Sequence, residues 1–523
     1  MASPQQQVQK AAARALTARL RTIDAGLAYP STQRHRLRTG PTPPARALAD
    51  QALTSQALEK MRAETRQAHR SYSLARALTG RMADLLVADG FVVEPTTDDQ
   101  DFNLAASERW ERWCRNCTIR QNGRSFTQVL RGIATAWMLD GDELLLMVAG
   151  NGKREGVLQE IEADRVVNPG GWAKQDTAEC IAGVQFDTEG APTYYYVVSR
   201  ADALQDTYAN VLETTPVAAE YAHLCANPLS ELINQTRGEP GLHTSVQTIE
   251  RIEKYVSDQA TAAMIATLFG LVFTTENPGA AASALNTQTG EDQQSDDGFG
   301  GSAQKVGLQA GFMLTAKPGE ELTQVKPEFP QQSTKEFVQL LVQMCAADVG
   351  LPLILVMLDP SAVNFHGFKS ALAVTWRRMS FGQDVLAGFI RRVYEWKIAE
   401  WIASGELTAP ASMVRSDEQG MLVRLHDVAK AHIVGPEIPT PDFGQDADGY
   451  AKAIEQNLMT RTQATQKLGT GNAAAILRGR AQERKEEIEY GIVPPSMPGA
   501  KAMGGTMGGE PAAGAGVKKE EVK

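Results

Sequence analysis

The strongest constraint on the fold is a pair of helical segments that flank an insertion containing a Gly-, Ser-, Asp- and Gln-rich stretch. Over 244–269, apolar side chains recur near the 3.6-residue period of a helix, at Val246, Ile249, Ile252, Val256, Ala260, Ala263, Met264 and Leu268. Thr244 and Gln247 have the spacing of a capping box, which predicts a helix start there. A shorter helix is predicted over 333–349, and 271–331 separates the two. Two rods around an insertion are more typical of an elongated subunit than of a compact enzyme.

An α+β region is predicted ahead of the first rod, from 47 to 241. Its helical patterns cover 47–88, 104–117 and 124–139. Its strand-like runs cover 91–95, 143–149, 157–167, 182–187 and 194–199. Because turn residues such as Asn151-Gly152 separate these short runs, we expect an antiparallel arrangement.

The chain after the second rod is predicted to be mainly helical. The segment 360–369 is predicted as a loop, and a helix of ~50 Å is expected over 370–404. Further helices are expected up to about 489, and 494–523 has a Gly-, Ala-, Pro- and Met-rich composition that predicts disorder. The expected fold class is therefore α+β, mainly helical, with several packed regions, since 523 residues exceed one ordinary core.

The charge balance argues against a nucleic-acid-binding protein of the usual basic kind. The chain carries 52 Lys and Arg against 62 Asp and Glu, a net charge of −10. Residues 1–46 are the exception, because they contain eight basic side chains and one acidic side chain, Asp24. Such an arm is expected either to bind an anionic surface or a partner protein, or to be an ordinary solvated helix and linker.

The sequence also bears on the compartment. No stretch approaches the ~20 apolar residues of a membrane span, and the first ten residues lack a signal-peptide pattern. The five cysteines are few and scattered, which favours a reducing compartment. A cytosolic origin is therefore expected.

Local catalytic motifs are absent from the sequence. Cys114 and Cys117 form its one CxxC, and no second pair of ligands follows at zinc-site spacing. Gly152-Lys153 lacks the other residues of a phosphate loop, and the acidic stretch 292–298 lacks the Gly and Glu of a calcium loop. We therefore expect no catalytic residue, no metal and no cofactor, although a dispersed site would escape such a search.

Five segments, in order along the chain, are similar to those of one family. They are GDELLLMV at 141–148, EIEADRVVNPG at 160–170, CIAGVQFDTEGAPTYYYVV at 180–198, QTRGEPGLHTSVQTIERIEKYVSDQATAAM at 235–264 and HIVGPEIPTPDFGQDADGYAKAIEQNLMTRTQATQKLG at 432–469. Through them the chain resembles the lambda-type portal proteins of tailed bacteriophages, also called head–tail connectors or portal vertex proteins. The most specific match is the segment 235–264, a Gln-Thr-Arg-Gly turn that leads into a long helix. The match is poor at 66–76, and 275–305 is unlike the family.

The resemblance implies the phage portal fold, a ring of typically twelve subunits with wing, stem, clip and crown regions. Carried onto this chain, the implied regions are a basic amino-terminal arm (1–46), an α+β wing region (47–241), a stem helix (242–270), a clip (271–331), a second stem helix (332–350), a tunnel-loop region (351–369), a long wing helix (370–419), a helical crown (420–490) and a disordered tail (491–523).

The resemblance also implies a function. The ring would form the channel at one capsid vertex through which double-stranded DNA is packaged and ejected. Its implied partners are that DNA, the terminase, a head–tail adaptor and the major capsid or scaffolding protein, with no membrane. The implied location is the virion, with the host cytoplasm during assembly. Residues expected to approach DNA from the tunnel loop are Asn364, Phe365, His366 and Lys369, and those expected to face the motor or adaptor from the clip tip are Asp292, Asp296 and Asp297.

Two other classes of function stay open from the residues alone. One is a different ring-forming virion connector, which the two rods disfavour because tail-tube subunits are mostly β. The other is a packaging-associated nuclease with a dispersed metal site, which would need clustered Asp and Glu ligands.

Overall fold

The computed structural model describes residues 49–119, 123–151, 154–170, 176–177, 179–203, 213–229, 232, 234–268, 272–275, 320–323, 332–359, 365–417, 420–423, 425–436, 443–468 and 473–490. The predicted arm (1–46), clip-tip aspartates and tail (491–523) lie outside these residues, as does Asn364. The chain divides into two units, Met1–Thr54 with Leu232–Gln235, and Ser55–Glu231 with Thr236–Lys523. In the first of these two units, the helix that the structure describes is α2 (Ala49–Ala52).

Four helices at the start of the second unit confirm the helical patterns predicted between 47 and 139. They are α3 (Ser55–Ser71), α4 (Ser73–Val87), α5 (Gln100–Cys114) and α6 (Phe126–Leu139). Asp99 caps α5 by accepting from the backbone N–H of Phe102, and Ser125 and Gln128 form a capping box at the start of α6. Buried aromatic rings join these helices in one core, with the Trp110 ring 5.3 Å from that of Phe126.

Two antiparallel sheets follow. The first has the order β3-β2-β8, with β2 (Asp142–Val148), β3 (Val157–Ile161) and β8 (Ala222–Ala226). The second has the order β4-β5-β6-β7, with β4 (Cys180–Ile181), β5 (Val184–Phe186), β6 (Pro192–Val198) and β7 (Thr214–Ala218). The short helices here are η1 (Ala163–Arg165), α7 (Arg200–Ala203) and η2 (Ala219–Tyr221). The strand predicted over 157–167 is wrong beyond Ile161, where η1 turns the chain.

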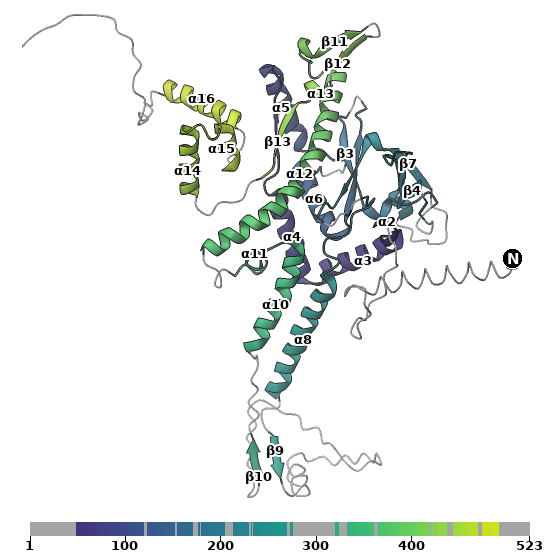
Figure 1. The fold of residues 1–523 in the computed structure, drawn as a ribbon, viewed down its shortest axis with the longest axis vertical. Helices are drawn as coiled ribbons and strands as arrows, with labels where there is room; N and C mark the ends of the chain where they lie inside the picture. The colour runs from purple at the N-terminus through teal and green to yellow at the C-terminus, as the bar shows by residue number, and fades with distance from the viewer. Residues whose placement is uncertain are drawn as a thin grey trace, which may run out of the picture. The chain divides into compact units, whose positions relative to one another are not determined.

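The two predicted rods are present as α8 (Val246–Leu268) and α10 (Gln332–Val349), which lie side by side (Figure 1). The capping box predicted at 244 and 247 is wrong: α8 begins at Val246, and the hydroxyl of Thr244 bonds the carboxylate of Asp348 on α10. Within the insertion, β9 (Val272–Thr275) pairs antiparallel with β10 (Glu320–Thr323). The described part of the insertion is thus a two-stranded ladder.

The longest helix is α12 (Phe365–Ala403), which follows the short α11 (Leu353–Met357). The prediction of a loop through 369 with a helix from 370 is wrong by five residues, because 365–369 is helical. One glycine near the start of a helix costs only about 1 kcal/mol, so Gly367 does not stop a helix of 39 residues. The buried face of α12 carries Met379, Leu386, Phe389, Ile390, Val393, Tyr394, Ile398 and Trp401.

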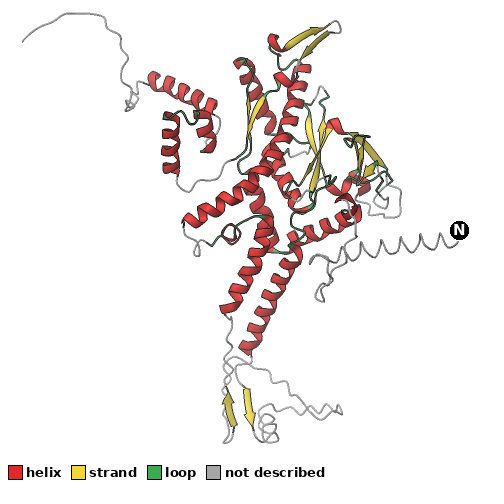
Figure 2. Cartoon of the chain, in the orientation of Figure 1, coloured by secondary structure: helices red, strands yellow, loops and turns green. Residues whose placement is uncertain are grey.

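The region after α12 is only partly helical, as the yellow arrows of Figure 2 show. The elements in order are η4 (Ala411–Met413), β11 (Val414–Asp417), β12 (Gly420–Val423), α13 (Leu425–Val428), β13 (Ala431–Val434), α14 (Phe443–Glu455), α15 (Arg461–Lys467) and α16 (Ala473–Glu489). The predicted helical crown is therefore wrong for 420–434. There β12 pairs with β11, and β13 pairs with β1 (Val92–Pro95), which confirms the strand predicted at 91–95. No helix in the described residues has the length and apolar character to cross a membrane.

Candidate functional site

Two of the segments that carry the family resemblance meet at a pair of glycines. Gly141, at the turn from α6 into β2, has a φ of +85°, and the backbone of Gly238 lies against it. A Cβ at either position would collide with the carbonyl oxygen of the other. The N–H of Asn227 donates to the Gly141 carbonyl over 2.8 Å. Glycine is therefore required at both positions, because two backbones approach too closely for any side chain.

Next to these glycines, Arg237 and Asp142 form a buried, bidentate ion pair. Nε of Arg237 lies 2.6 Å from Oδ2 of Asp142, and Nη2 lies 2.7 Å from Oδ1. The remaining guanidinium N–H groups donate to the carbonyl oxygens of Ala163, Val166 and Ala182. The two side chains are 2% and 0% exposed. All five N–H groups of Arg237 thus have partners, which a buried guanidinium requires.

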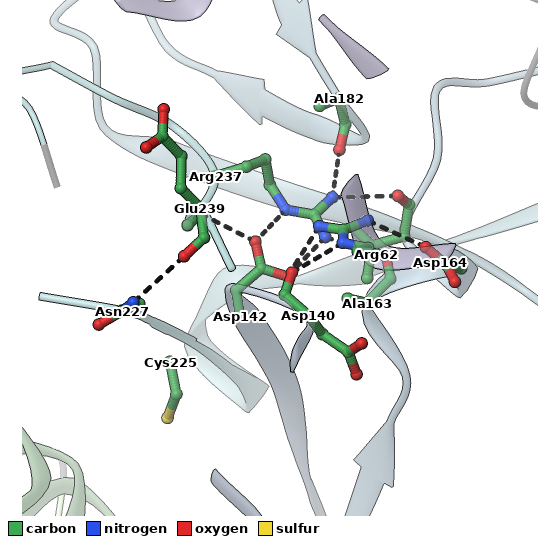
Figure 3. Close-up of polar contacts among 12 residues, drawn as sticks. Arg62, Asp140, Asp142, Ala163, Asp164, Ala182, Cys225, Asn227, Arg237 and Glu239 are labelled. Carbon is green, nitrogen blue, oxygen red and sulfur yellow. Dashed lines mark hydrogen bonds and ion pairs between the residues drawn. The ribbon is translucent and has the colours of Figure 1, made fainter. Parts of the chain in front are cut away.

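The ion pair continues outward as a chain of alternating charges, called here the charged centre: Arg237, Asp142, Arg62, Asp164, Arg66 and Asp140. Figure 3 shows the guanidinium groups of Arg62 and Arg237 converging on the carboxylate of Asp142. Arg62 and Arg66 are four residues apart on α3 and so share a helix face. Three arginines balance three aspartates, so the charged centre has no net charge.

The electrostatics keep the central pair ionised. Burial by itself raises the pKa of Asp142, but the charges of Arg237 and Arg62 outweigh it and hold that pKa below its ordinary value. Burial likewise lowers the pKa of Arg237, and Asp142 more than restores it. The stability that Asp142 contributes is present above its unfolded pKa of about 3.9 and is lost as the pH falls through the lower folded pKa.

Two cavities border the charged centre. The smaller has a volume of about 30 Å³, which suits about one water molecule, and its lining includes Arg62, Asp164 and Arg237. The larger has a volume of about 330 Å³, and its lining includes Asp140 and Asp142. Within the described residues, no group of three or more His, Cys, Asp or Glu side chains is placed to hold a metal ion. The arrangement joins segments of the fold that are far apart in the sequence.

We expect alanine at Gly141 to lower the free energy of unfolding by about 2–3 kcal/mol, because it adds both a strained φ and a collision with Gly238. Gly190 supplies the control: its φ is +89°, and nothing lies within 4 Å of a Cβ built there. Gly190→Ala should therefore cost only the strain, about 1 kcal/mol. Urea denaturation of both variants measures the difference between their free energies of unfolding. Equal losses for Gly141→Ala and Gly190→Ala would show that the backbone of Gly238 leaves room for a side chain at position 141.

A second candidate surface is the apolar exposed face of α10. Phe337, Leu340 and Met344 are 47%, 54% and 59% exposed, and their spacing of three and four residues places them on one face. The opposite face is buried, with Val342, Cys345, Ala346 and Val349. The ring of Phe337 packs against that of Tyr255 on α8, with the ring centroids 5.4 Å apart, whereas Leu340 and Met344 are more exposed. A helix that is apolar on both faces is typical of a buried position.

The neighbouring α8 carries exposed apolar side chains from its middle onward. Ile249 and Val256 are seven residues apart and so lie on one face, which Met264 continues. Ile249 is fully buried against the body of the chain, whereas Val256 and Met264 are 47% and 68% exposed. The apolar face of α8 is thus buried near its start and more exposed farther along.

The predicted tunnel-loop residues are only partly described. Phe365 is the first residue of α12, and its side chain lies outside the described part. His366 is exposed and Lys369 is half-buried, three residues apart in the first turn of α12, so they share a helix face. The structure therefore places three of the four, Phe365, His366 and Lys369, on a helix instead of in a loop. Asn364 and the clip-tip residues Asp292, Asp296 and Asp297 lie outside the described residues.

Sequence reasoning missed the charged centre. Arg237 lies in the Gln-Thr-Arg-Gly turn and Asp142 follows Gly141 in the GDELLLMV segment, so both lay in matched motifs. In each motif a glycine stands directly beside a charged residue, Gly238 beside Arg237 and Gly141 beside Asp142. This pairing was the available signal. Charged side chains are mostly exposed, which is why this signal did not predict an ion pair.

Comparison with known proteins gives one family. The family described as "Phage portal protein, lambda family" matches residues 35–383. No curated protein sequence matches the chain.

Three solved structures are similar at low identity. The neck of a native gene transfer agent particle, computed with C12 symmetry, is 12% identical, covers 78% of this chain and 93% of its own, and has a TM-score of 0.43. The neck of an empty particle, computed with C6 symmetry, is 11% identical, with coverage of 83% and 97% and a TM-score of 0.44. An HK97-family phage portal protein from Corynebacterium diphtheriae is 10% identical, with coverage of 58% and 81% and a TM-score of 0.25.

Proposed function

This chain belongs to the lambda family of phage portal proteins, whose model matches more than half of its length, and from that premise we propose that about twelve copies form a ring at one vertex of the capsid. Double-stranded DNA enters and leaves the head through the channel of this ring. The family match carries the proposal, and the exposed apolar side chains of α8 and α10 support it.

The ring requires two different surfaces on each subunit, because a closed ring of more than two copies is built from head-to-tail contacts. The exposed face of α10, with Phe337, Leu340 and Met344, supplies one surface. The exposed side chain of Val256, near the middle of α8, supplies part of the other on the next copy. Burying each of these apolar side chains contributes roughly 1.5–3 kcal/mol. Contacts of this kind make α8 and α10 the stem of the ring.

The charge of the chain suits a conduit. Contacts to phosphate dominate the affinity of proteins for DNA, so a strongly basic bore would hold the duplex and oppose its movement. The chain has a net charge of −10, and Lys369 is the positive residue among those expected near DNA. One lysine from each subunit gives a weak and evenly spaced contact.

Deleting residues 361–364 and replacing Lys369 by alanine is expected to leave rings intact but to reduce the DNA retained in filled heads several-fold. The deletion ends before α12, so the helix is preserved. Nuclease-protected DNA per head is the measurement, made with the capsid and packaging proteins of the phage that encodes the chain. Lys335→Ala on α10, also the loss of one lysine, is the control and should package normally. Normal DNA-filled heads from the first variant would rule out this role for the segment.

Portal proteins are structural, and the chain is proposed to have no enzymatic activity of its own. The energy for packaging is then supplied by the terminase, which docks on the ring, as does the head–tail adaptor. Asp292, Asp296 and Asp297 are proposed to contact one of these partners, and the major capsid or scaffolding protein surrounds the ring. The ring assembles in the host cytoplasm and stays in the virion. Divalent-metal-dependent cleavage of plasmid DNA by the purified chain would instead favour a nuclease.

A further inference from the structure

Arg237 connects segments that are far apart in the sequence. Through Asp142 it is bonded to the start of β2, and through Ala163 to η1. Its other two bonds go to Val166, which bridges to Val197 on β6, and to Ala182, in the turn between β4 and β5. One side chain therefore holds both sheets and the loop that enters α8.

The loop after Arg237 is fixed to the end of α6. The N–H groups of Gly241 and Leu242 donate to the carbonyl oxygens of Trp137 and Met138, over 2.9 and 3.1 Å. These carbonyls belong to the last turn of α6, where helical partners are lacking. The N–H of Gly238 donates to the carboxylate of Asp142 over 3.0 Å. The chain thus enters α8 from a loop whose backbone is bonded to both α6 and the charged centre.

The start of α8, where the helix leaves this loop, is called here its root. The direction of the helix at the root determines the position of its far end. The helix has 23 residues, so it extends for about 34 Å. A tilt of about 10° at the root would move the far end by about 6 Å at this length. Apolar side chains are in contact only when their atoms approach within about 4–4.5 Å. Met264 lies about 27 Å along the helix and would move by about 5 Å under this tilt, so its contact with a neighbouring subunit depends on how closely the start of α8 is held.

We propose that Arg237 is a positioning residue that sets the direction of α8, and through it the geometry of the contact between subunits. The proposal rests on the function given above, in which α8 and α10 form that contact. Lysine cannot take the place of Arg237, because an ammonium has three donors and lacks the planar fork that binds a carboxylate through two parallel bonds. Arg237→Lys keeps the charge and removes most of the bonds to the two sheets.

The test compares Arg237→Lys with a control of equal stability. Ile398→Ala removes a buried side chain from α12, and the urea midpoints of the two variants show whether their stabilities match. Arg237→Lys is expected to speed hydrogen exchange at the amides of Asn227, Gly241, Leu242 and Ile249 at least tenfold. By native mass spectrometry it is expected to give fewer closed rings or a spread of subunit numbers. The control should change neither.

The proposal is overturned if Arg237→Lys and Ile398→Ala show the same exchange at these amides and the same ring distribution. If the unaltered chain forms no rings at all, the proposed function fails, and the exchange result still decides whether Arg237 fixes the root. Should Arg237→Lys not fold, the triple variant Arg62→Met, Asp142→Leu and Arg237→Met removes the shared carboxylate together with both of its buried arginines, which buried charge clusters tolerate better than the loss of one partner. The same rise in exchange is expected there, and its absence would also overturn the proposal.

Discussion

Asp142→Ala lowers the free energy of unfolding by about 3–5 kcal/mol, because it leaves two buried guanidinium groups without their shared carboxylate. Arg237 and Arg62 are 2% and 5% exposed, so water cannot replace the lost partner without opening the fold. Domains have a total stability of about 5–15 kcal/mol, so much of the protein should be unfolded or aggregated. Urea denaturation followed by circular dichroism measures the loss.

Asp84→Ala is the matched control for this prediction. Asp84 also pairs with an arginine, Arg131, but its side chain is 47% exposed. Exposed ion pairs contribute about 0–1 kcal/mol, so this variant should unfold close to the unaltered protein. Equal losses for the two aspartates would contradict the role given to the charged centre.

Replacing both Leu340 and Met344 by glutamate converts rings to folded monomers. Each side chain loses roughly 1.5–3 kcal/mol of apolar burial at the contact between subunits, and each glutamate adds a charge that burial disfavours. A loss of about 4 kcal/mol weakens the contact about a thousandfold. Light scattering during gel filtration at micromolar concentrations gives the mass, and circular dichroism checks that α10 is still folded.

Gln339 provides the control, because it is a half-buried residue of α10 that lies one residue from Leu340 and five from Met344, and so is not on their face. Gln339→Glu adds a charge to the same helix and should leave rings unchanged. Rings that persist in the double variant at the same concentration would show that the α10 face does not lie between subunits.

The rods could be predicted because their signal is local. In α8 the apolar period runs from Val246 to Leu268, and the observed bounds agree with the predicted ones within two residues. The start of α12 was not predicted, because Phe365–Lys369 contains a glycine and belongs to the segment that was predicted as a loop. Local pattern therefore predicts the middle of a helix better than its ends.

Long-range pairing could not be predicted from local pattern. β13 pairs with β1 through partners such as Val92 and Val434, which lie far apart in the sequence. β7 contains Pro216, which weakens its strand signal, and it pairs only with β6 at the edge of its sheet. The charged centre was missed for the same reason, because Arg237 and Asp142 are 95 residues apart in the sequence. The sequence comparison identified their segments, but not the bond between them.

The most direct test of the portal assignment is electron microscopy of the purified chain, with native mass spectrometry of the same sample. The proposed function predicts closed rings of about twelve subunits with a central hole wide enough for duplex DNA. A chain that stays monomeric at assembly concentrations, or that forms open filaments, would contradict it.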